Sequence, residues 1–187
     1  CIPAYSVVNR DFSFKSGQSY VQLMYPAFEY GSEERYPLSG GIMLLGGLMS
    51  SRLFQEIREK RGLCYNIEAE SVLYKCAGYA NILYSCAEKS GDKVLELVLS
   101  EIRKLVEKGI SDDELTTVKN QLIFSYISNF ETLESRVQMN FRHIYHYGRL
   151  LESDEIMSRI ESLDRKSIQE TAQKIFGGEY SICRLVK

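Results

Sequence analysis

His143 and His146, the two histidines of this chain, are its first candidates for metal chemistry. They lie three residues apart in FRHIYHYGR, a spacing that places two side chains on one face of a helix. A zinc site needs three or four protein ligands, and the nearest carboxylates that could join are those of Glu152 and Glu155. No acid stands between the histidines as a general base would. We therefore interpret both as helix-surface histidines interleaved with packing tyrosines, and we predict no metal site in this chain.

Arg58 and Tyr65 are a second candidate pair, seven residues apart in SSRLFQEIREKRGLCYNIEAES, residues 50–71. The segment predicts a short amphipathic helix, a left-handed stop at Gly62 and then a strand. A guanidinium group and a phenol can both donate hydrogen bonds. Judged by residue type alone, Arg58 is a solvated helix arginine and Tyr65 is a core tyrosine of the strand.

Other catalytic patterns are missing from the sequence. It contains no G-x-S-x-G, and two histidines leave little room for a nucleophilic triad. The run GGIMLLGG at residues 40–47 lacks the lysine of a phosphate-binding loop, so we interpret its glycines as helix breakers and close-packing positions. The acidic residues Asp112, Asp113 and Glu114 follow Ser111, which predicts a capping box and a favourable interaction with the helix dipole.

Length and composition narrow the class of protein. The chain has 187 residues, 44% hydrophobic and 26% charged, with a net charge of −2, which predicts one folded domain over residues 1–187. No basic block marks a nucleic-acid binder, and the longest nearly apolar run, residues 40–49, is too short to span a bilayer. We see no signal-peptide pattern. Among five cysteines there is no C-x-x-C pair, so we predict free buried thiols, Cys76 and Cys86 among them, and a cytoplasmic location.

Alternating apolar and polar residues indicate the strands. They are expected at residues 18–26, 65–73, 77–87 and 180–186, with a short edge strand at 12–14. In the second of these, the alternation puts Tyr65 on the same core-facing side as Ile67, Ala69 and Leu73. Pro26 is expected to end the first strand.

Helical spacing of apolar residues predicts the remaining elements. Helices are expected from Pro37 to the glycines at 46–47, around residues 53–57, and at about 91–108, 111–126, 133–147, 152–160 and 165–176. Strands and helices do not alternate regularly, which argues against a doubly wound sheet. We therefore predict an α+β fold in which a layer of helices covers a mixed or antiparallel sheet.

One segment resembles a known family. LLGGLMSSRLFQEIREKRGLCYNI, residues 44–67, is similar to the C-terminal half-domain of the insulinase (pitrilysin) family of zinc metallopeptidases, and within it to the bacterial processing-protease branch related to mitochondrial processing peptidase. The segments AGYANILYSCA, GISDDELTTVKNQL and ESLDRKSIQETAQKIFGG follow in the order that the family has. The resemblance covers most of residues 18–187.

The resemblance implies a peptidase whose two similar halves close on a peptide substrate. The first half of such enzymes carries H-x-x-E-H, whose histidines bind zinc and whose glutamate activates water. The second half carries an arginine and a tyrosine seven residues apart, which match Arg58 and Tyr65. The resemblance implies that the tyrosine donates to the oxyanion of the tetrahedral intermediate, while the arginine holds substrate carbonyls. An edge strand of the half-domain is expected to accept the peptide as an added strand.

This chain departs from the family pattern because it contains no H-x-x-E-H. The resemblance therefore assigns the zinc of the complete enzyme to an N-terminal half, which is either removed or a separate subunit, and the isolated chain is expected to be inactive. The resemblance leaves open whether the full enzyme forms a homodimer. The alternative is a non-catalytic subunit or scaffold of the same superfamily, and intact Arg58 and Tyr65 favour the enzyme over it. An unrelated α+β binding domain is a third interpretation. Expected partners are the zinc-binding half and a peptide, without nucleic acid or membrane.

Overall fold

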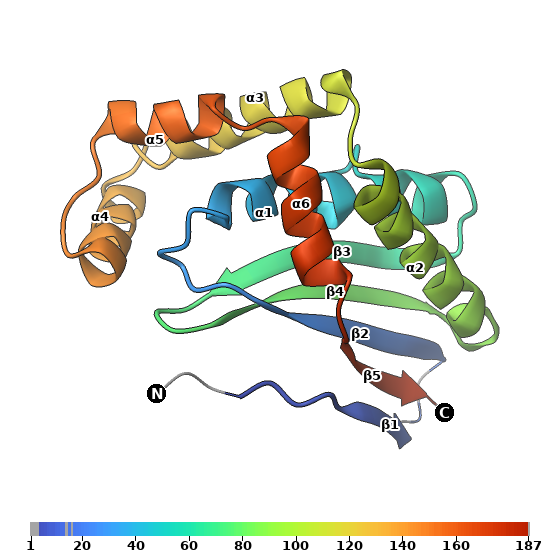
Figure 1. The fold of residues 1–187 in the computed structure, drawn as a ribbon. Helices are drawn as coiled ribbons and strands as arrows, with labels where there is room; N and C mark the ends of the chain where they lie inside the picture. The colour runs from blue at the N-terminus through green and yellow to red at the C-terminus, as the bar shows by residue number, and fades with distance from the viewer. Residues whose placement is uncertain (1–3, 14, 16, 187) are drawn as a thin grey trace.

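The protein folds into one five-stranded sheet with helices on one of its faces, as Figure 1 shows. The structure is a computed structural model that describes residues 4–13, 15 and 17–186. The strands are β1 (Asn9–Ser13), β2 (Gln18–Ala27), β3 (Cys64–Leu73), β4 (Gly78–Ala87) and β5 (Ser181–Val186). The α-helices are α1 (Arg35–Ile42), α2 (Gly91–Lys108), α3 (Asp112–Ser128), α4 (Leu133–Tyr147), α5 (Ser153–Glu161) and α6 (Arg165–Phe176). Two π-helical segments, η1 (Met43–Gly47) and η2 (Phe54–Glu59), and the 3₁₀ turn η3 (Glu88–Ser90) complete the described elements.

The sheet is mixed and has the strand order β1-β5-β2-β4-β3. β1 pairs with β5 in parallel, and the other neighbours are antiparallel. The predicted α+β class is therefore confirmed. The short strand expected at residues 12–14 is the edge strand β1, which begins earlier, at Asn9; Phe14 lies outside the described residues.

The core lies between the sheet and the helices. The alternating residues Val21, Leu23 and Tyr25 of β2 are buried on the helix-covered face, as their spacing predicts. The prediction that Pro26 ends this strand is wrong, because β2 continues to Ala27. Pairing with β5 stops at Met24, so Pro26 lies where one side of the strand has become an edge, and there proline is tolerated.

The helices form two layers over the sheet in Figure 1, where α1, α6 and α2 lie next to it and α3 and α5 lie further out. The helix α4 stands beyond the turn that joins β3 and β4, where the Lys75 ammonium is 5.2 Å from the ring centroid of Tyr145. Among the described residues, no helix combines the length and apolar character needed to cross a bilayer. The helix α1 begins at Arg35, and Pro37 sits in its first turn, where its missing N–H costs little.

The start of α3 anchors the segment that precedes the candidate pair. The predicted capping box is present: Ser111 Oγ accepts from the Glu114 amide at 3.2 Å, and the Glu114 carboxylate accepts from the Ser111 amide at 2.8 Å. The same carboxylate accepts from Arg52 Nε at 2.7 Å. Burial opposes ionisation of Glu114, but the hydrogen bonds from Arg52 and Ser111 outweigh it and lower the pKa of Glu114. Arg52 and Glu114 thereby tie the beginning of η2 to α3.

The cysteines Cys64, Cys76, Cys86 and Cys183 are free thiols, and Cys1 lies outside the described residues. The expectation that Cys76 is buried is wrong. It is exposed because it lies in the connection between β3 and β4 rather than in a strand. Cys64 and Cys86 are buried opposite each other on β3 and β4. A hydrogen bond with Cys86, together with burial, raises the pKa of the Cys64 thiol.

Candidate functional site

Arg58 lies near the end of η2, and its charge is not neutralised within the described part of the chain. Its guanidinium carbon is 4.6 Å from the ring centroid of Phe54 and 5.9 Å from that of Tyr65. Such a position over aromatic faces holds the planar group by cation–π attraction. Arg58 makes no hydrogen bond or ion pair with any residue that the structure describes. Its donors are therefore available to an acceptor outside the chain.

Gly62 connects the helical segment to the strand. Its φ of 60° is in the left-handed region, as its position after the helix predicts. The Gly62 amide donates to the Arg58 carbonyl at 2.9 Å, and the next amide, that of Leu63, donates to Ile57 at 3.0 Å. These bonds close the end of the helix and fix the direction in which β3 leaves it. Arg58 and Tyr65 are brought together by this turn.

Tyr65 lies at a β-bulge, and this corrects the sequence-based prediction of its place. In the pairing with β4, Cys64 is opposite Cys86 and Asn66 is opposite Ser85, so Tyr65 has no partner. An extra residue of this kind shifts the alternation that follows it. The Tyr65 side chain is 78% exposed instead of lying in the core, and buried Cys64 takes the core-facing position. A strand that followed the regular alternation would have buried the phenol.

The phenol of Tyr65 borders a hollow of about 330 Å³ on the face of the sheet that the helices leave uncovered. The hollow is lined by Gln18, Tyr20, Tyr65, Asn66, Leu83, Tyr84 and Ser85. The Tyr20 hydroxyl donates to Gln18 at 3.4 Å, whereas the Tyr65 hydroxyl makes no hydrogen bond with a described residue. The Tyr84 hydroxyl donates to the Gly91 carbonyl at the start of α2, at 3.4 Å, and burial, followed by the neighbouring thiols, raises the pKa of Tyr84. We call Arg58, Tyr65 and this hollow the Arg58–Tyr65 surface.

The Arg58–Tyr65 surface is suited to binding oxygen atoms. A guanidinium group has only donors, and a phenol near neutral pH is an effective donor as well. Two adjacent donors that have no hydrogen-bond partner among the described residues can hold carbonyl oxygens or a developing oxyanion. Neither group is a strong nucleophile or general base at neutral pH. The surface can therefore stabilise negative charge but does not by itself form a complete hydrolytic centre.

The two histidines lie elsewhere, and one of them contradicts the prediction. His143 is 3% exposed rather than on the helix surface, because α4 turns it inward to accept the Leu151 amide on Nδ1 at 3.4 Å. The His146 ring stacks on Tyr30 with centroids 4.0 Å apart. Burial, with the charge of Arg35, lowers the pKa of both imidazoles.

These histidines do not fit a zinc site. The Nδ1 atom of His143 already accepts a hydrogen bond from the Leu151 amide. Among the described residues, no group of three or more His, Cys, Asp or Glu side chains is placed to hold a metal ion. Glu155, which the sequence offered as a further ligand, is instead bound by Arg149 and Arg159 at 2.8 Å each.

Comparison with known proteins decides the family. The profile of a family described as "Peptidase M16 inactive domain" matches residues 5–122. The chain belongs to the M16 peptidase family. This finding confirms the family predicted from residues 44–67, whereas the processing-peptidase branch stays a prediction. The match includes η2, Gly62 and the whole of β3, so the Arg58–Tyr65 pair lies inside the part that identifies an M16 inactive domain.

Curated relatives of this M16 domain are named as zinc proteases. An uncharacterized zinc protease of Streptomyces coelicolor is 28% identical over 168 residues, which are 90% of this chain and 37% of the relative. One of Bacillus subtilis is 27% identical over 165 residues, 88% of this chain and 40% of the relative. One of Rickettsia felis is 31% identical over 134 residues, 72% of this chain and 32% of the relative. The M16 domain thus spans only about two fifths of the first two proteins.

Solved structures share the fold of this M16 domain. The peptidase M16 inactive domain from Pseudomonas fluorescens has a TM-score of 0.87 and 20% identity, over 98% of this chain and 45% of that one. A protease from Helicobacter pylori has a TM-score of 0.88 and 15% identity, over 96% and 44%. A conserved protein from Enterococcus faecalis has a TM-score of 0.84 and 23% identity, over 98% and 42%. The mixed sheet with helices on one face is therefore the architecture of M16 inactive domains.

Proposed function

We propose that residues 1–187 form the C-terminal, substrate-binding half of a zinc endopeptidase. The observation that carries this proposal is the bulge that turns the Tyr65 phenol outward, next to Arg58, with neither side chain hydrogen-bonded or ion-paired to a residue that the structure describes. Membership of the M16 family and the zinc-protease names of the relatives supply the reaction class, hydrolysis of peptide bonds. The partner is a zinc-bearing N-terminal half, in the same chain or in a separate subunit.

The two residues have different proposed roles. The Tyr65 hydroxyl donates a hydrogen bond to the carbonyl oxygen of the scissile bond, and the bond strengthens as that oxygen becomes negative in the tetrahedral intermediate. The Arg58 guanidinium holds neighbouring carbonyl oxygens of the peptide with its planar set of donors. Stacking on Phe54 limits the rotation of the guanidinium, which reduces the entropy lost on binding.

The position of β3 at the edge of the sheet supports the proposed mode of peptide binding, in which the peptide adds to the sheet as a further strand. β3 is the last strand in the order and is paired on one side, with β4, among the described strands. An extended peptide added to the other side would be held by backbone hydrogen bonds, a mode that tolerates many sequences. Tyr65 lies in this strand, so the peptide backbone would pass beside its phenol.

The zinc of the complete enzyme belongs, in this proposal, to the other half, because the described side chains of this chain do not fit a zinc site. The four free thiols support a reducing location such as the cytoplasm. A non-catalytic subunit of the same superfamily is the alternative function. The description of the matching family as an inactive domain is compatible with both. The alternative makes no use of Arg58 and Tyr65, so their substitution separates the two.

The test combines the purified 187-residue chain with a separately prepared zinc-bearing half and follows cleavage of a fluorogenic peptide pool. We expect no cleavage by the chain alone and chelator-sensitive cleavage by the mixture. Arg58→Lys should raise KM and lower kcat together, because an ammonium cannot reproduce the planar fork. Arg61→Lys is the matched control, since Arg61 lies on the same segment and is already paired with Glu56. Robust cleavage by the chain alone, or identical kinetics of the Arg58 variant and wild type, would refute the proposal.

A further inference from the structure

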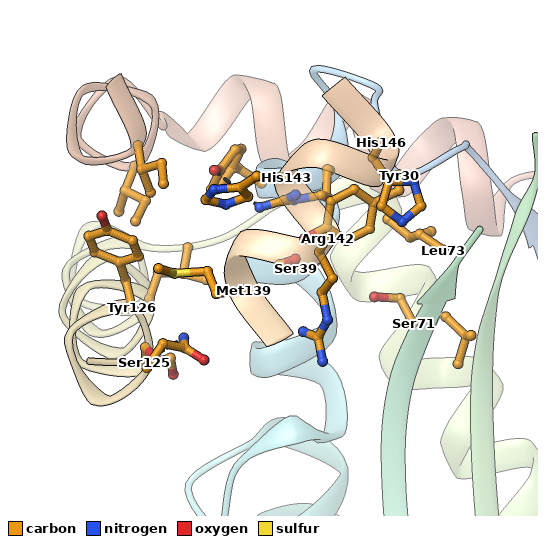
Figure 2. A pocket seen from close by; sticks show the side chains of 17 residues that line it. Tyr30, Ser39, Ser71, Leu73, Ser125, Tyr126, Met139, Arg142, His143 and His146 are labelled. Carbon is orange, nitrogen blue, oxygen red and sulfur yellow. Dashed lines mark hydrogen bonds between the residues drawn. The ribbon is translucent and has the colours of Figure 1, made fainter. Parts of the chain in front are cut away.

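A second hollow lies far from the Arg58–Tyr65 surface. Figure 2 shows this cavity, whose volume is about 560 Å³, within the range of pockets that hold small organic molecules. Its walls come from α1, α3, α4 and α5, and from the end of β3 at Ser71 and Leu73. Ser71 and Tyr65 are six residues apart on β3, or about 20 Å at the rise of a strand. The cavity is therefore separate from the proposed active surface.

The charged side chains of the cavity wall are all basic. Its polar lining includes Arg35, Arg142, His143 and His146, and no carboxylate belongs to it. In Figure 2, Arg142 extends from α4 between Ser39 and Ser71, which also line the cavity. Arg142 has no hydrogen bond or ion pair with any residue in the described part of the chain.

Arg35 is half-buried but has no carboxylate partner among the described residues. Its guanidinium donates to the hydroxyls of Tyr36 at 3.1 Å and Tyr147 at 3.2 Å, and lies 4.2 Å from the ring centroid of Tyr30. A cation removed from water without a counter-charge is costly. These contacts orient Arg35 firmly while leaving its charge uncompensated, which is the condition in which an anion binds most favourably.

His146 adds an independent sign of an incomplete site. Its Nδ1 atom is buried and has no hydrogen-bond partner among the described residues. Buried polar atoms are nearly always paired in folded proteins, so an orphaned one points to a missing group. Burial, followed by the charges of Arg35, Lys75 and Arg142, lowers the pKa of His146. Two of these three charges, those of Arg35 and Arg142, belong to side chains that line the cavity.

The rest of the wall is apolar. Leu122, Met139, Ile156 and Ile160 line it, and Tyr126 adds an aromatic side chain. We propose that this cavity binds a small organic anion, with an aromatic or aliphatic body against these side chains and a carboxylate or phosphate group between Arg35 and Arg142. Planar guanidinium groups favour both head groups because each offers two oxygens for parallel hydrogen bonds. This proposal does not depend on the peptidase function.

The probe that tests this site is phenyl phosphate, compared with inorganic phosphate and with phenol. Binding to the 187-residue chain is followed by NMR titration, with melting temperatures as a fold control. We expect phenyl phosphate to bind more tightly than either fragment, because only it has both the body and the charge. Benzoate in place of phenyl phosphate separates the two head groups, and saturable binding of either one supports the site.

Two arginines of one helix give the matched variants. Arg142→Ala should weaken phenyl phosphate binding about tenfold or more, since it removes a hydrogen-bonding charge from the wall. Arg136→Ala should leave binding unchanged, because Arg136 is also exposed on α4 but rests against Phe130 and does not line the cavity. Absence of saturable binding of both anions, equal binding of phenol and phenyl phosphate, or the same loss in both variants would overturn the inference.

Discussion

Tyr65→Phe is the change that most directly tests the outward-turned phenol. The substitution removes one hydroxyl and keeps the ring, its strand propensity and its position 5.9 Å from Arg58. Because the side chain is 78% exposed and its hydroxyl has no partner among the described residues, the free energy of unfolding should change by no more than about 0.5 kcal/mol. Loss of one oxyanion donor typically lowers kcat by about 10²–10³, which corresponds to roughly 3–4 kcal/mol. Activity should thus fall far more than stability.

The assay is steady-state cleavage of a fluorogenic peptide by this chain together with the zinc-bearing half. We expect kcat and kcat/KM to fall alike, since the bond to the hydroxyl strengthens only as charge develops on the substrate oxygen. Tyr74→Phe is the control, because Tyr74 is 57% exposed just beyond the other end of β3. It should leave both activity and melting temperature unchanged. If Tyr65→Phe cleaves at the wild-type rate while its fold is intact, the phenol has no part in the reaction.

The other predictions concern the turn, a cap and the histidines. Gly62→Ala should destabilise the chain by about 1–2 kcal/mol in chemical denaturation, because Gly62 has a φ of 60°, whereas Gly31→Ala, at an open position without a positive φ, should cost less. Equal costs would contradict the left-handed turn. Glu114→Gln should cost about 1 kcal/mol at pH 7. The pKa of Glu114 is lowered in the fold, so the stability that its charge contributes is present above the ordinary carboxyl pKa of 4.5 and is lost as the pH falls through the folded pKa. The unfolding free energies of wild type and variant should therefore converge in acid. A difference between them that stays constant with pH would refute this. Replacing His143 and His146 together by alanine should leave the metal content of the purified chain unchanged by elemental analysis, and loss of stoichiometric zinc would show that they are ligands.

Local chemistry accounts for the elements that the sequence predicts well. The capping box at Ser111 and the stop at Gly62 depend on neighbours within a few residues, and both are present as predicted. The bulge at Tyr65 depends instead on how β3 aligns with β4, an alignment in which the buried cysteines Cys64 and Cys86 lie opposite each other. That alignment is not visible in β3 alone, where Tyr65 continues the apolar alternation.

The cavity of Figure 2 could not be predicted for the same reason. Arg35 on α1 and Arg142 on α4 are separated by more than one hundred residues, and only the tertiary fold makes both line one cavity. The incomplete ligand set around His143 indicates a helix-surface residue, whereas its burial follows from the loop that returns Leu151 to α4. The family resemblance pointed to Arg58 and Tyr65 but carried no information about this second hollow. Contacts between segments that are far apart in the sequence determine both the cavity and the burial of His143.

Tyr65 is the residue of β3 that the ladder with β4 does not require. Deletion of its single codon would leave Cys64 opposite Cys86 and Asn66 opposite Ser85, with the regular alternation restored and every buried side chain of the strand retained. Descendants of this domain can therefore abandon the phenol in one mutational step without sacrificing the architecture. Conversely, insertion of one tyrosine into a regular strand at this position would place its side chain outward. In the proposed function, loss of the Tyr65 hydroxyl donor is therefore separable from loss of the scaffold, because one deletion removes the first and keeps the second.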